Sequence, residues 1–166
     1  MIHGQLFLPN TSGKHPALVF FHGGSRRQML LGWHYMDAYS YTYGINQYWA
    51  SKGYVVLSVN YRSGIGYGLN FREAANYGAG GASEFNDVLG AGLYMRARPD
   101  VDVKQIGVWG PSYGGLLTAM ALGRSSDLFA AGVEMMGLHD WSAPGASVAT
   151  PIADPDKQRD QARLAF

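Results

Sequence analysis

Residues 106–115, IGVWGPSYGG, decide the fold that this 166-residue chain is expected to adopt. The apolar run at residues 106–109 has the length of a buried strand. Ser112 follows shortly after it, and the almost wholly apolar residues 113–122 predict a buried helix. Glycines stand two positions before and two positions after the serine, where side chains would collide across a tight turn. The segment therefore predicts a strand, a sharp turn at Ser112 and a helix.

The rest of the chain repeats this alternation of short apolar runs and longer helical stretches. Further strands are predicted at residues 17–21 (ALVFF), 54–59 (YVVLSV) and 131–135 (AGVEM). Further helices are predicted at residues 45–52 and 83–98, and the second ends on Arg96 and Arg98, as the helix dipole favours. This alternation predicts an α/β fold, with a mostly parallel sheet and helices on both of its faces.

Ser112 is the candidate nucleophile. A strained turn between a strand and a helix lifts the serine hydroxyl above the sheet. The N-terminus of the following helix favours the negative charge that develops when a hydroxyl attacks a carbonyl group. The backbone N–H of Tyr113 would donate a hydrogen bond to that charge. The alternative for this motif alone is a glycine-rich turn that carries an ordinary serine.

A second segment, FHGG at residues 21–24, directly follows the predicted strand at residues 17–21. In hydrolases with a serine on such a turn, an HGG-type segment in this place supplies the second oxyanion donor. By itself, His22 would more simply be a capped surface histidine. Two such motifs in the right order, each directly after a strand, favour a hydrolase site built from His22, Gly23, Ser112 and Tyr113.

Five blocks of sequence together resemble the catalytic domain of the prolyl oligopeptidase family of serine peptidases. They run in family order between Gly4 and Trp141 and read LVFFHGG, SVNYRSGIGYG, ASEFNDVLGAGLYMRARPDVD, IGVWGPSYGGLLTAM and HDW. The resemblance implies an α/β-hydrolase fold that lacks the C-terminal strands within these 166 residues. It also implies a serine hydrolase that cleaves peptide, acyl-peptide or ester bonds through an acyl-enzyme on Ser112, without a cofactor.

The same resemblance implies roles for individual residues. Tyr113, Leu138 and Trp141 fall where the family lines its primary specificity pocket, and Gly23 falls on the substrate side of the oxyanion segment. His22 lies where some members place a tyrosine whose hydroxyl also donates to the oxyanion. One departure is Ser25, which stands where the family often has proline after HGG.

The base and acid that a serine nucleophile requires are harder to find in this chain. In this fold they follow the serine in the order acid, then histidine. His139 is the only histidine after Ser112, and the acidic residues between the two are Asp127 and Glu134. Asp127 precedes the strand at residues 131–135, which places it about 20 Å from the catalytic edge. Glu134 lies inside that strand and is interpreted as structural or pocket-adjacent.

His139 is interpreted as a structural or pocket residue, because the family carries a similar His-Asp-Trp without using this histidine as the base. We therefore expect the triad acid and base beyond residue 166. On this interpretation residues 1–166 are one partial catalytic domain, and residues 142–166 are a truncated tail. The chain alone is then a poor hydrolase that self-associates or needs a complementing C-terminal segment.

Composition limits the other classes of function. With 47% hydrophobic residues and a net charge of +1, the chain can form a packed core, and its charge gives no reason to expect nucleic acid or a membrane surface as partner. There is no cysteine, and the five histidines are scattered, so no metal site is predicted. Neither a signal peptide nor a membrane-spanning run is evident, which slightly favours the cytoplasm.

Two alternatives to a hydrolase were weighed. The first is a non-catalytic remnant of the same fold that binds a partner or oligomerises through an exposed sheet edge. The second is nucleotide binding through the glycines of GIGYG at residues 64–68 or GAGG at residues 78–81. Neither glycine segment has the G-x-G-x-x-G spacing that opens a helix directly after a strand, and no P-loop lysine follows. The sequence therefore disfavours nucleotide binding.

Overall fold

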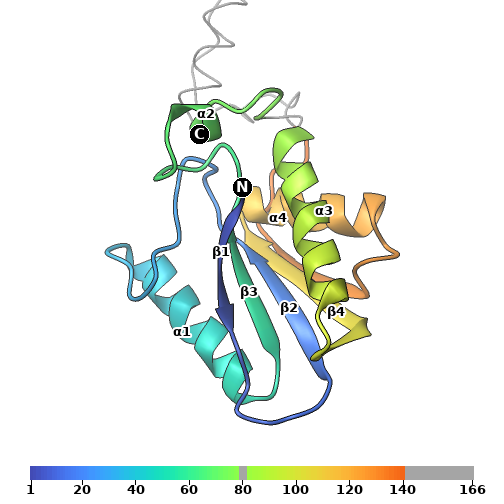
Figure 1. Ribbon diagram of the computed structural model, residues 1–166. Helices are drawn as coiled ribbons and strands as arrows, with labels where there is room; N and C mark the ends of the chain where they lie inside the picture. Colours follow the sequence, from blue (N-terminus) through green and yellow to red (C-terminus); the bar gives the residue numbers. More distant parts are fainter. Residues whose placement is uncertain (79–81, 141–166) are drawn as a thin grey trace, which may run out of the picture.

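The computed structural model describes residues 1–78 and 82–140, and its strands form one mixed sheet in the order β1-β3-β2-β4-β5 (Figure 1). The strands are β1 (His3–Phe7), β2 (His15–Phe21), β3 (Val55–Asn60), β4 (Val101–Pro111) and β5 (Ala131–Met135). Strand β1 runs antiparallel to β3, and every other neighbouring pair is parallel. The predicted α/β fold with a mostly parallel sheet is confirmed.

Helices cover both faces of this sheet. They are α1 (Asp37–Ser51), α3 (Ala82–Ala97) and α4 (Tyr113–Arg124), while the one-turn helix α2 (Leu69–Arg72) lies beyond the carboxyl ends of the strands (Figure 1). The connection from β2 to β3 steps toward one edge of the sheet and carries α1, whereas the connection from β3 to β4 steps back toward the other edge and carries α3. Because such crossovers are right-handed, α1 lies on one face and α3 on the other, beside α4 (Figure 1).

The main core lies between the sheet and the helices α3 and α4. Its fully buried side chains come from β2, β3, β4, both helices and the residue that follows β3, and they include Val19, Phe21, Val55, Tyr61, Met95, Ile106 and Leu117. A smaller cluster of Phe20, Met29 and Tyr39 lies on the α1 side. Burial on both faces holds the central strands firmly, so their carboxyl ends are fixed relative to one another.

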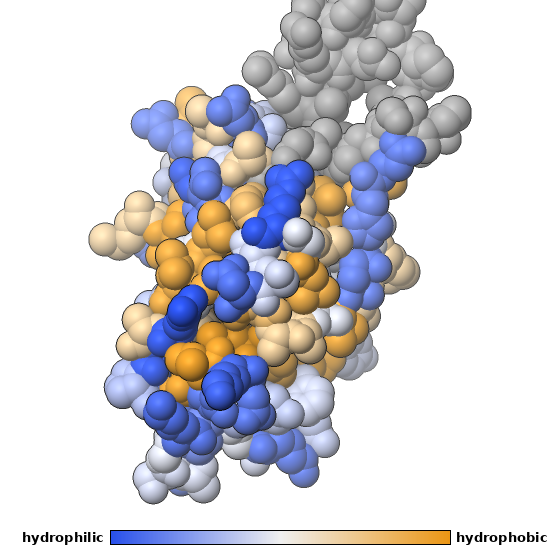
Figure 2. Space-filling model, turned by 90° about the vertical axis from the view of Figure 1, so that its right-hand side faces the viewer, coloured by the Kyte–Doolittle hydropathy of each residue, from blue (hydrophilic) through white to orange (hydrophobic). Residues whose placement is uncertain are grey.

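The outer surface on the α3 side interleaves apolar and charged residues (Figure 2). Leu93 and Tyr94 of α3 are among the exposed apolar side chains. A groove of about 330 Å³ lies between β1, β3 and α3, and it is lined by Leu6, Leu57, Val59, Ala91 and Tyr94, among others. No helix in the described part of the chain is long and apolar enough to cross a bilayer.

Four elements differ from the sequence predictions: β1 and α2 were not predicted, and β4 and α1 begin well before their predicted starts. Strand β1 was not predicted, since HGQLF lies at a sheet edge, has no fully buried residue and shows no clear alternation of apolar and polar residues. Helix α1 begins at Asp37, well before the predicted start at residue 45. Its buried residues include the polar Thr42 and Asn46, so the first half of the helix has no continuous apolar stripe that would predict it.

Candidate active site

Ser112 lies at the carboxyl edge of the sheet, between the end of β4 and the start of α4. Its backbone has φ 55° and ψ −118°, a conformation that costs energy for any residue with a Cβ atom. Two hydrogen bonds hold it there: the Ser112 N–H donates to Met135 O over 2.7 Å, and Ser112 O accepts from the Leu116 N–H over 3.1 Å. This is the strained strand-to-helix turn that a nucleophile serine requires.

The glycines around the turn are required by neighbouring backbone. A Cβ added at Gly110 or Gly114 would overlap the carbonyl oxygen of Phe21, the last residue of β2. A Cβ added at Gly115 would lie 2.7 Å from Glu134 Oε1, beside the end of β5. The glycines therefore allow the ends of β2 and β5 to approach the serine turn from two sides, as well as allowing the turn itself.

The segment after β2 also contacts the turn. A Cβ added at Gly23 would lie 3.2 Å from Ser112 Cβ and 3.2 Å from the carbonyl oxygen of Pro111. The structure thus brings together three of the residues that the sequence singled out, Gly23, Ser112 and Tyr113. They come from loops that follow β2 and β4, which are neighbours in the sheet.

The two carbonyl groups of the HGG segment are each held by a tyrosine hydroxyl. His22 O accepts from the Tyr61 hydroxyl over 2.7 Å, and Gly23 O accepts from the Tyr39 hydroxyl over 3.0 Å. In a trans peptide the N–H group points opposite to the carbonyl group, so the N–H groups of Gly23 and Gly24 point away from these hydroxyls. Neither N–H donates to an acceptor within the described residues.

The ring of His22 is turned into the protein. It is fully buried, stacks on Tyr61 at 4.3 Å between ring centroids, and its Nδ1 lies 2.9 Å from Gly23 O. Burial lowers the pKa of His22 to about 4, so the ring is neutral near pH 7 and its one proton lies on Nδ1. The ring therefore has no N–H left for a substrate, unlike the tyrosine hydroxyl that the resemblance implied here. What His22 can offer the site is its backbone.

The side chain of Tyr113 points away from solvent and is fixed at its tip. Its hydroxyl lies 2.7 Å from Gly78 O and 3.0 Å from Glu84 Oε1, and burial raises the pKa of Tyr113 well above its usual value. Glu84 is itself fully buried and also accepts from the Gly78 N–H and the Ser83 hydroxyl. The residue after the candidate nucleophile is thereby tied to the first turn of α3.

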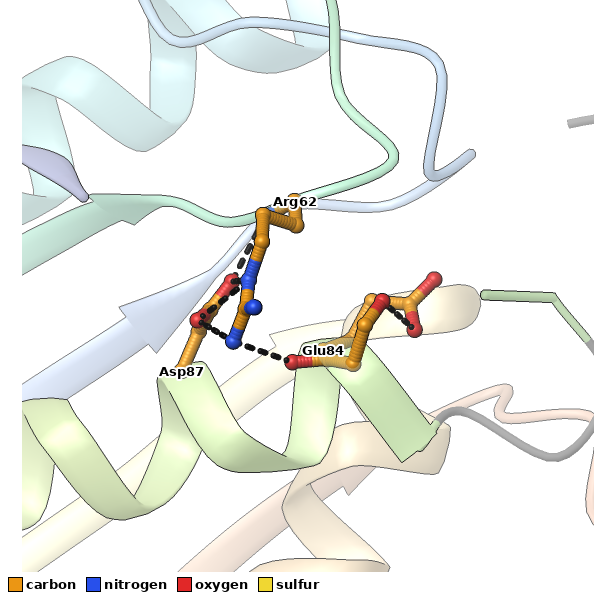
Figure 3. Close-up of polar contacts among 4 residues, drawn as sticks. Arg62, Glu84 and Asp87 are labelled. Atoms are coloured by element: carbon orange, nitrogen blue, oxygen red, sulfur yellow. Dashed lines mark hydrogen bonds and ion pairs between the residues drawn. The ribbon is translucent and has the colours of Figure 1, made fainter. Parts of the chain in front are cut away.

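An ion pair on α3 anchors the end of β3 (Figure 3). The Arg62 guanidinium donates to Asp87 Oδ1 over 2.6 and 2.9 Å and to Asp87 Oδ2 over 3.1 Å, and the Arg62 backbone N–H donates to Asp87 Oδ2 over 2.7 Å. A further bond joins the guanidinium to Ser83 O over 3.0 Å. These hydrogen bonds raise the pKa of Arg62. Because Tyr61 precedes Arg62, the pair also fixes the tyrosine that holds the HGG segment.

The remaining candidates lie beyond β5. Leu138 is partly exposed, whereas Trp141 lies outside the described residues. His139 Nε2 lies 3.6 Å from Glu134 Oε1, and both side chains are partly exposed. Asp127, at the other end of β5, makes only a long and exposed contact of 3.9 Å with Arg96. No cluster of three potential metal ligands is found among the described residues.

Tyr39 and Tyr61 are the site residues that sequence reasoning missed. Tyr61 follows the predicted strand at residues 54–59 by two positions, so its place at the carboxyl edge was available as a signal. Tyr39 gave no such signal, because it lies in the half of α1 that was not predicted.

Comparison with known proteins places these features in context. The sequence model of the prolyl oligopeptidase family matches residues 39–157. Dipeptidyl aminopeptidase BIII from Pseudoxanthomonas mexicana is 34% identical over 122 residues, which cover 74% of this chain and 16% of that protein.

Solved structures of peptidases also match this chain. The acylaminoacyl peptidase of Pyrococcus horikoshii matches with a TM-score of 0.66 and 33% identity, over 84% of this chain and 21% of that one. Dipeptidyl peptidase 4 of Porphyromonas gingivalis matches with a TM-score of 0.71 and 30% identity, over 84% of this chain and 19% of that one. The chain thus spans about a fifth of the length of these relatives.

Proposed function

Because the chain belongs to the prolyl oligopeptidase family, we propose that it carries the nucleophile and the oxyanion donors of a serine hydrolase that acts on peptide, acyl-peptide or ester bonds. The observation that carries this proposal is the contact between Gly23 and Ser112, whose positive φ is the mark of a nucleophile turn. The names of the relatives, dipeptidyl and acylaminoacyl peptidases, support a peptide or acyl-peptide substrate.

In the proposed reaction, Ser112 Oγ attacks the substrate carbonyl carbon while a general base accepts the hydroxyl proton. The oxyanion that forms accepts hydrogen bonds from the backbone N–H groups of Tyr113 and of the Gly23–Gly24 segment. The N-terminus of α4 further stabilises this charge. Collapse of the intermediate expels the leaving group, which takes the proton, and leaves an acyl-enzyme on Ser112. Water then releases the acyl group.

We propose that the base and its acid are not His139 and Glu134. Glu134 accepts from the Gly137 N–H, lies beside Gly115 and is 3.6 Å from His139, all at the end of β5. This arrangement fits a structural role, in which Glu134 and His139 support the first turn of α4. We also propose that Leu138 and Trp141, together with Tyr113, line the pocket for the substrate side chain next to the scissile bond.

The test combines a serine-directed phosphonate probe with turnover of an activated ester by the full chain. We expect slow labelling that Ser112→Ala abolishes, and residual ester hydrolysis of at most about 10³–10⁴ over water, which is what serine proteases retain without their triad. His139→Ala should leave both unchanged. Fast turnover that is lost in Ser112→Ala and in His139→Ala would instead make His139 the base.

A second candidate function is that of a binding or oligomerising module. The observation that favours it is β5, all five residues of which are exposed. An exposed edge strand can pair with another chain or with a complementing segment. A chain that self-associates but shows no labelling dependent on Ser112 would support this candidate over the hydrolase.

A further inference from the structure

We propose that Tyr61 and Tyr39 are positioning residues, which aim the N–H groups of Gly23 and Gly24 at the substrate oxyanion by holding the two carbonyl groups of the HGG segment. This inference rests on the proposed function. It goes beyond it by assigning the orientation of the oxyanion segment to two hydroxyl groups that bind the carbonyl oxygens of the segment.

The need for such a device follows from the sequence of the segment. Gly23 and Gly24 have no Cβ atoms, so their peptide groups can rotate into orientations that other residues avoid, and Gly24 has a positive φ of 83°. No side chain of their own can fix them. A peptide that rotated would exchange its N–H group for its carbonyl group on the side of Ser112 and would repel a developing oxyanion. The orientation must therefore come from partners of the carbonyl groups.

Tyr61 holds the first peptide, which joins His22 to Gly23. Its hydroxyl donates to His22 O over 2.7 Å from a fully buried ring. That ring stacks on the ring of His22 at 4.3 Å and on the ring of Tyr113 at 6.1 Å, with interplanar angles of 18° and 19°. Tyr61 therefore contacts His22, whose peptide carries the Gly23 N–H, and Tyr113, which is also a proposed donor, and the Arg62–Asp87 pair fixes its own backbone.

Tyr39 holds the second peptide, which joins Gly23 to Gly24. It comes from α1, on the sheet face opposite to α3, and its hydroxyl donates to Gly23 O over 3.0 Å. Burial raises its pKa, so this hydroxyl keeps its proton near neutral pH. His22 Nδ1 supplies a second bond to the same carbonyl oxygen. The segment is thus held by one tyrosine from each side of the sheet.

A positioning role differs from ordinary packing in what the hydroxyl does. Packing of these rings would be preserved in phenylalanine variants, whereas the hydrogen bonds to the carbonyl groups would be lost. The loss would fall on the peptide that each tyrosine holds. Tyr61→Phe releases the peptide whose N–H belongs to Gly23, and Tyr39→Phe releases the peptide whose N–H belongs to Gly24.

The experiment compares the full chain with Tyr61→Phe, Tyr39→Phe and the double variant. Tyr41→Phe is the matched control, since Tyr41 lies on the same helix as Tyr39 and its side chain is 72% exposed. Three quantities are measured: the rate of Ser112 labelling by the phosphonate probe, the kcat and KM for an activated ester, and the amide resonances of Gly23 and Gly24 in nuclear magnetic resonance spectra.

We expect each single variant to lower kcat and the labelling rate about tenfold with KM unchanged, less than the roughly 10²–10³-fold that loss of an oxyanion donor costs. Tyr61→Phe should shift mainly the Gly23 amide resonance, and Tyr39→Phe mainly that of Gly24. Tyr41→Phe should match the wild type. Circular dichroism of each variant shows whether the fold is retained.

The outcomes distinguish a failure of the proposed function from a failure of the positioning role. A wild-type chain without any labelling that depends on Ser112 overturns the proposed function, and the positioning role falls with it. Labelling that depends on Ser112 but is equally fast in both phenylalanine variants overturns the positioning role alone. Equal shifts of both glycine resonances in either variant also overturn it, because the proposal assigns one peptide to each tyrosine.

Discussion

The HGG segment and strand β5 both contact the Ser112 turn, yet they are built in opposite ways. Around the HGG segment, His22 and Tyr61 are fully buried, and both carbonyl groups of the segment are hydrogen-bonded. Along β5, by contrast, Val133 is 60% exposed, and Met136 just beyond it is 84% exposed. The described residues thus support the proposed nucleophile and oxyanion donors from within, whereas the β5 side of the site has little cover among them.

The largest expected effect comes from the backbone contact between β2 and α4. An added methyl group at Gly114 would overlap Phe21 O, whereas one at Gly123 on the same helix would meet no atom within 4 Å. We expect Gly114→Ala to lower the free energy of unfolding by at least about 3 kcal/mol. Gly123→Ala should raise it by about 0.5–1 kcal/mol. Urea denaturation followed by tryptophan fluorescence measures both, and equal midpoints would refute the contact.

The second prediction concerns the ion pair that anchors the end of β3. The side chain of Asp87 is only 2% exposed, whereas that of Asp100, which makes a similar two-fold contact with Arg98, is 33% exposed. Asp87→Ala should lower the free energy of unfolding by about 2–3 kcal/mol, because the guanidinium and the backbone N–H of Arg62 both lose their acceptor. Asp100→Ala should cost less than about 1 kcal/mol. A similar loss in the two variants would show that burial of the pair does not matter.

A third, smaller effect is a dependence on pH. Because burial lowers the pKa of His22 from 6.5 to about 4, the unfolded chain binds this proton first as the pH falls, and acid favours unfolding. The stabilisation is complete above pH 6.5 and is lost as the pH falls toward 4. Between pH 7.5 and 5.5 we expect a loss of about 1 kcal/mol. The measurement is the free energy of unfolding at both pH values in wild type and His22→Gln, and an identical pH dependence in the two contradicts the prediction.

The smallest effect on stability is expected at β5. Val133→Lys should change the free energy of unfolding by less than about 0.5 kcal/mol, because the side chain is already exposed. It should nevertheless reduce self-association, since a lysine on an edge strand opposes pairing with a second chain. Sedimentation velocity of this variant and of the control Val103→Lys, at an exposed position of β4, measures the difference. Unchanged association in Val133→Lys would show that β5 is not the contact.

Local patterns were enough to predict much of the site. Ser112 and the HGG segment each directly follow a buried strand, so the strand pattern alone placed them at one edge of the sheet. The roles of the two tyrosines could not be predicted in this way. The Tyr61 hydroxyl binds a carbonyl group 39 residues away in the sequence, and the Tyr39 hydroxyl binds one 16 residues away, and a local sequence pattern does not reveal such distant contacts. The edge strand β1 was missed for a different reason, since it buries too little apolar surface to leave a pattern.

The close approach of Phe21 O to Gly110 and Gly114 has a consequence for the order of folding. These contacts join parts of the chain that are about 90 residues apart, and closing such a loop is slow compared with forming a helix. The turn at Ser112 is strained on its own, and its bond to Met135 O forms only when β5 has docked. We therefore expect the turn at the proposed nucleophile to be among the last parts of the molecule to form, after the helices and strand pairs that surround it.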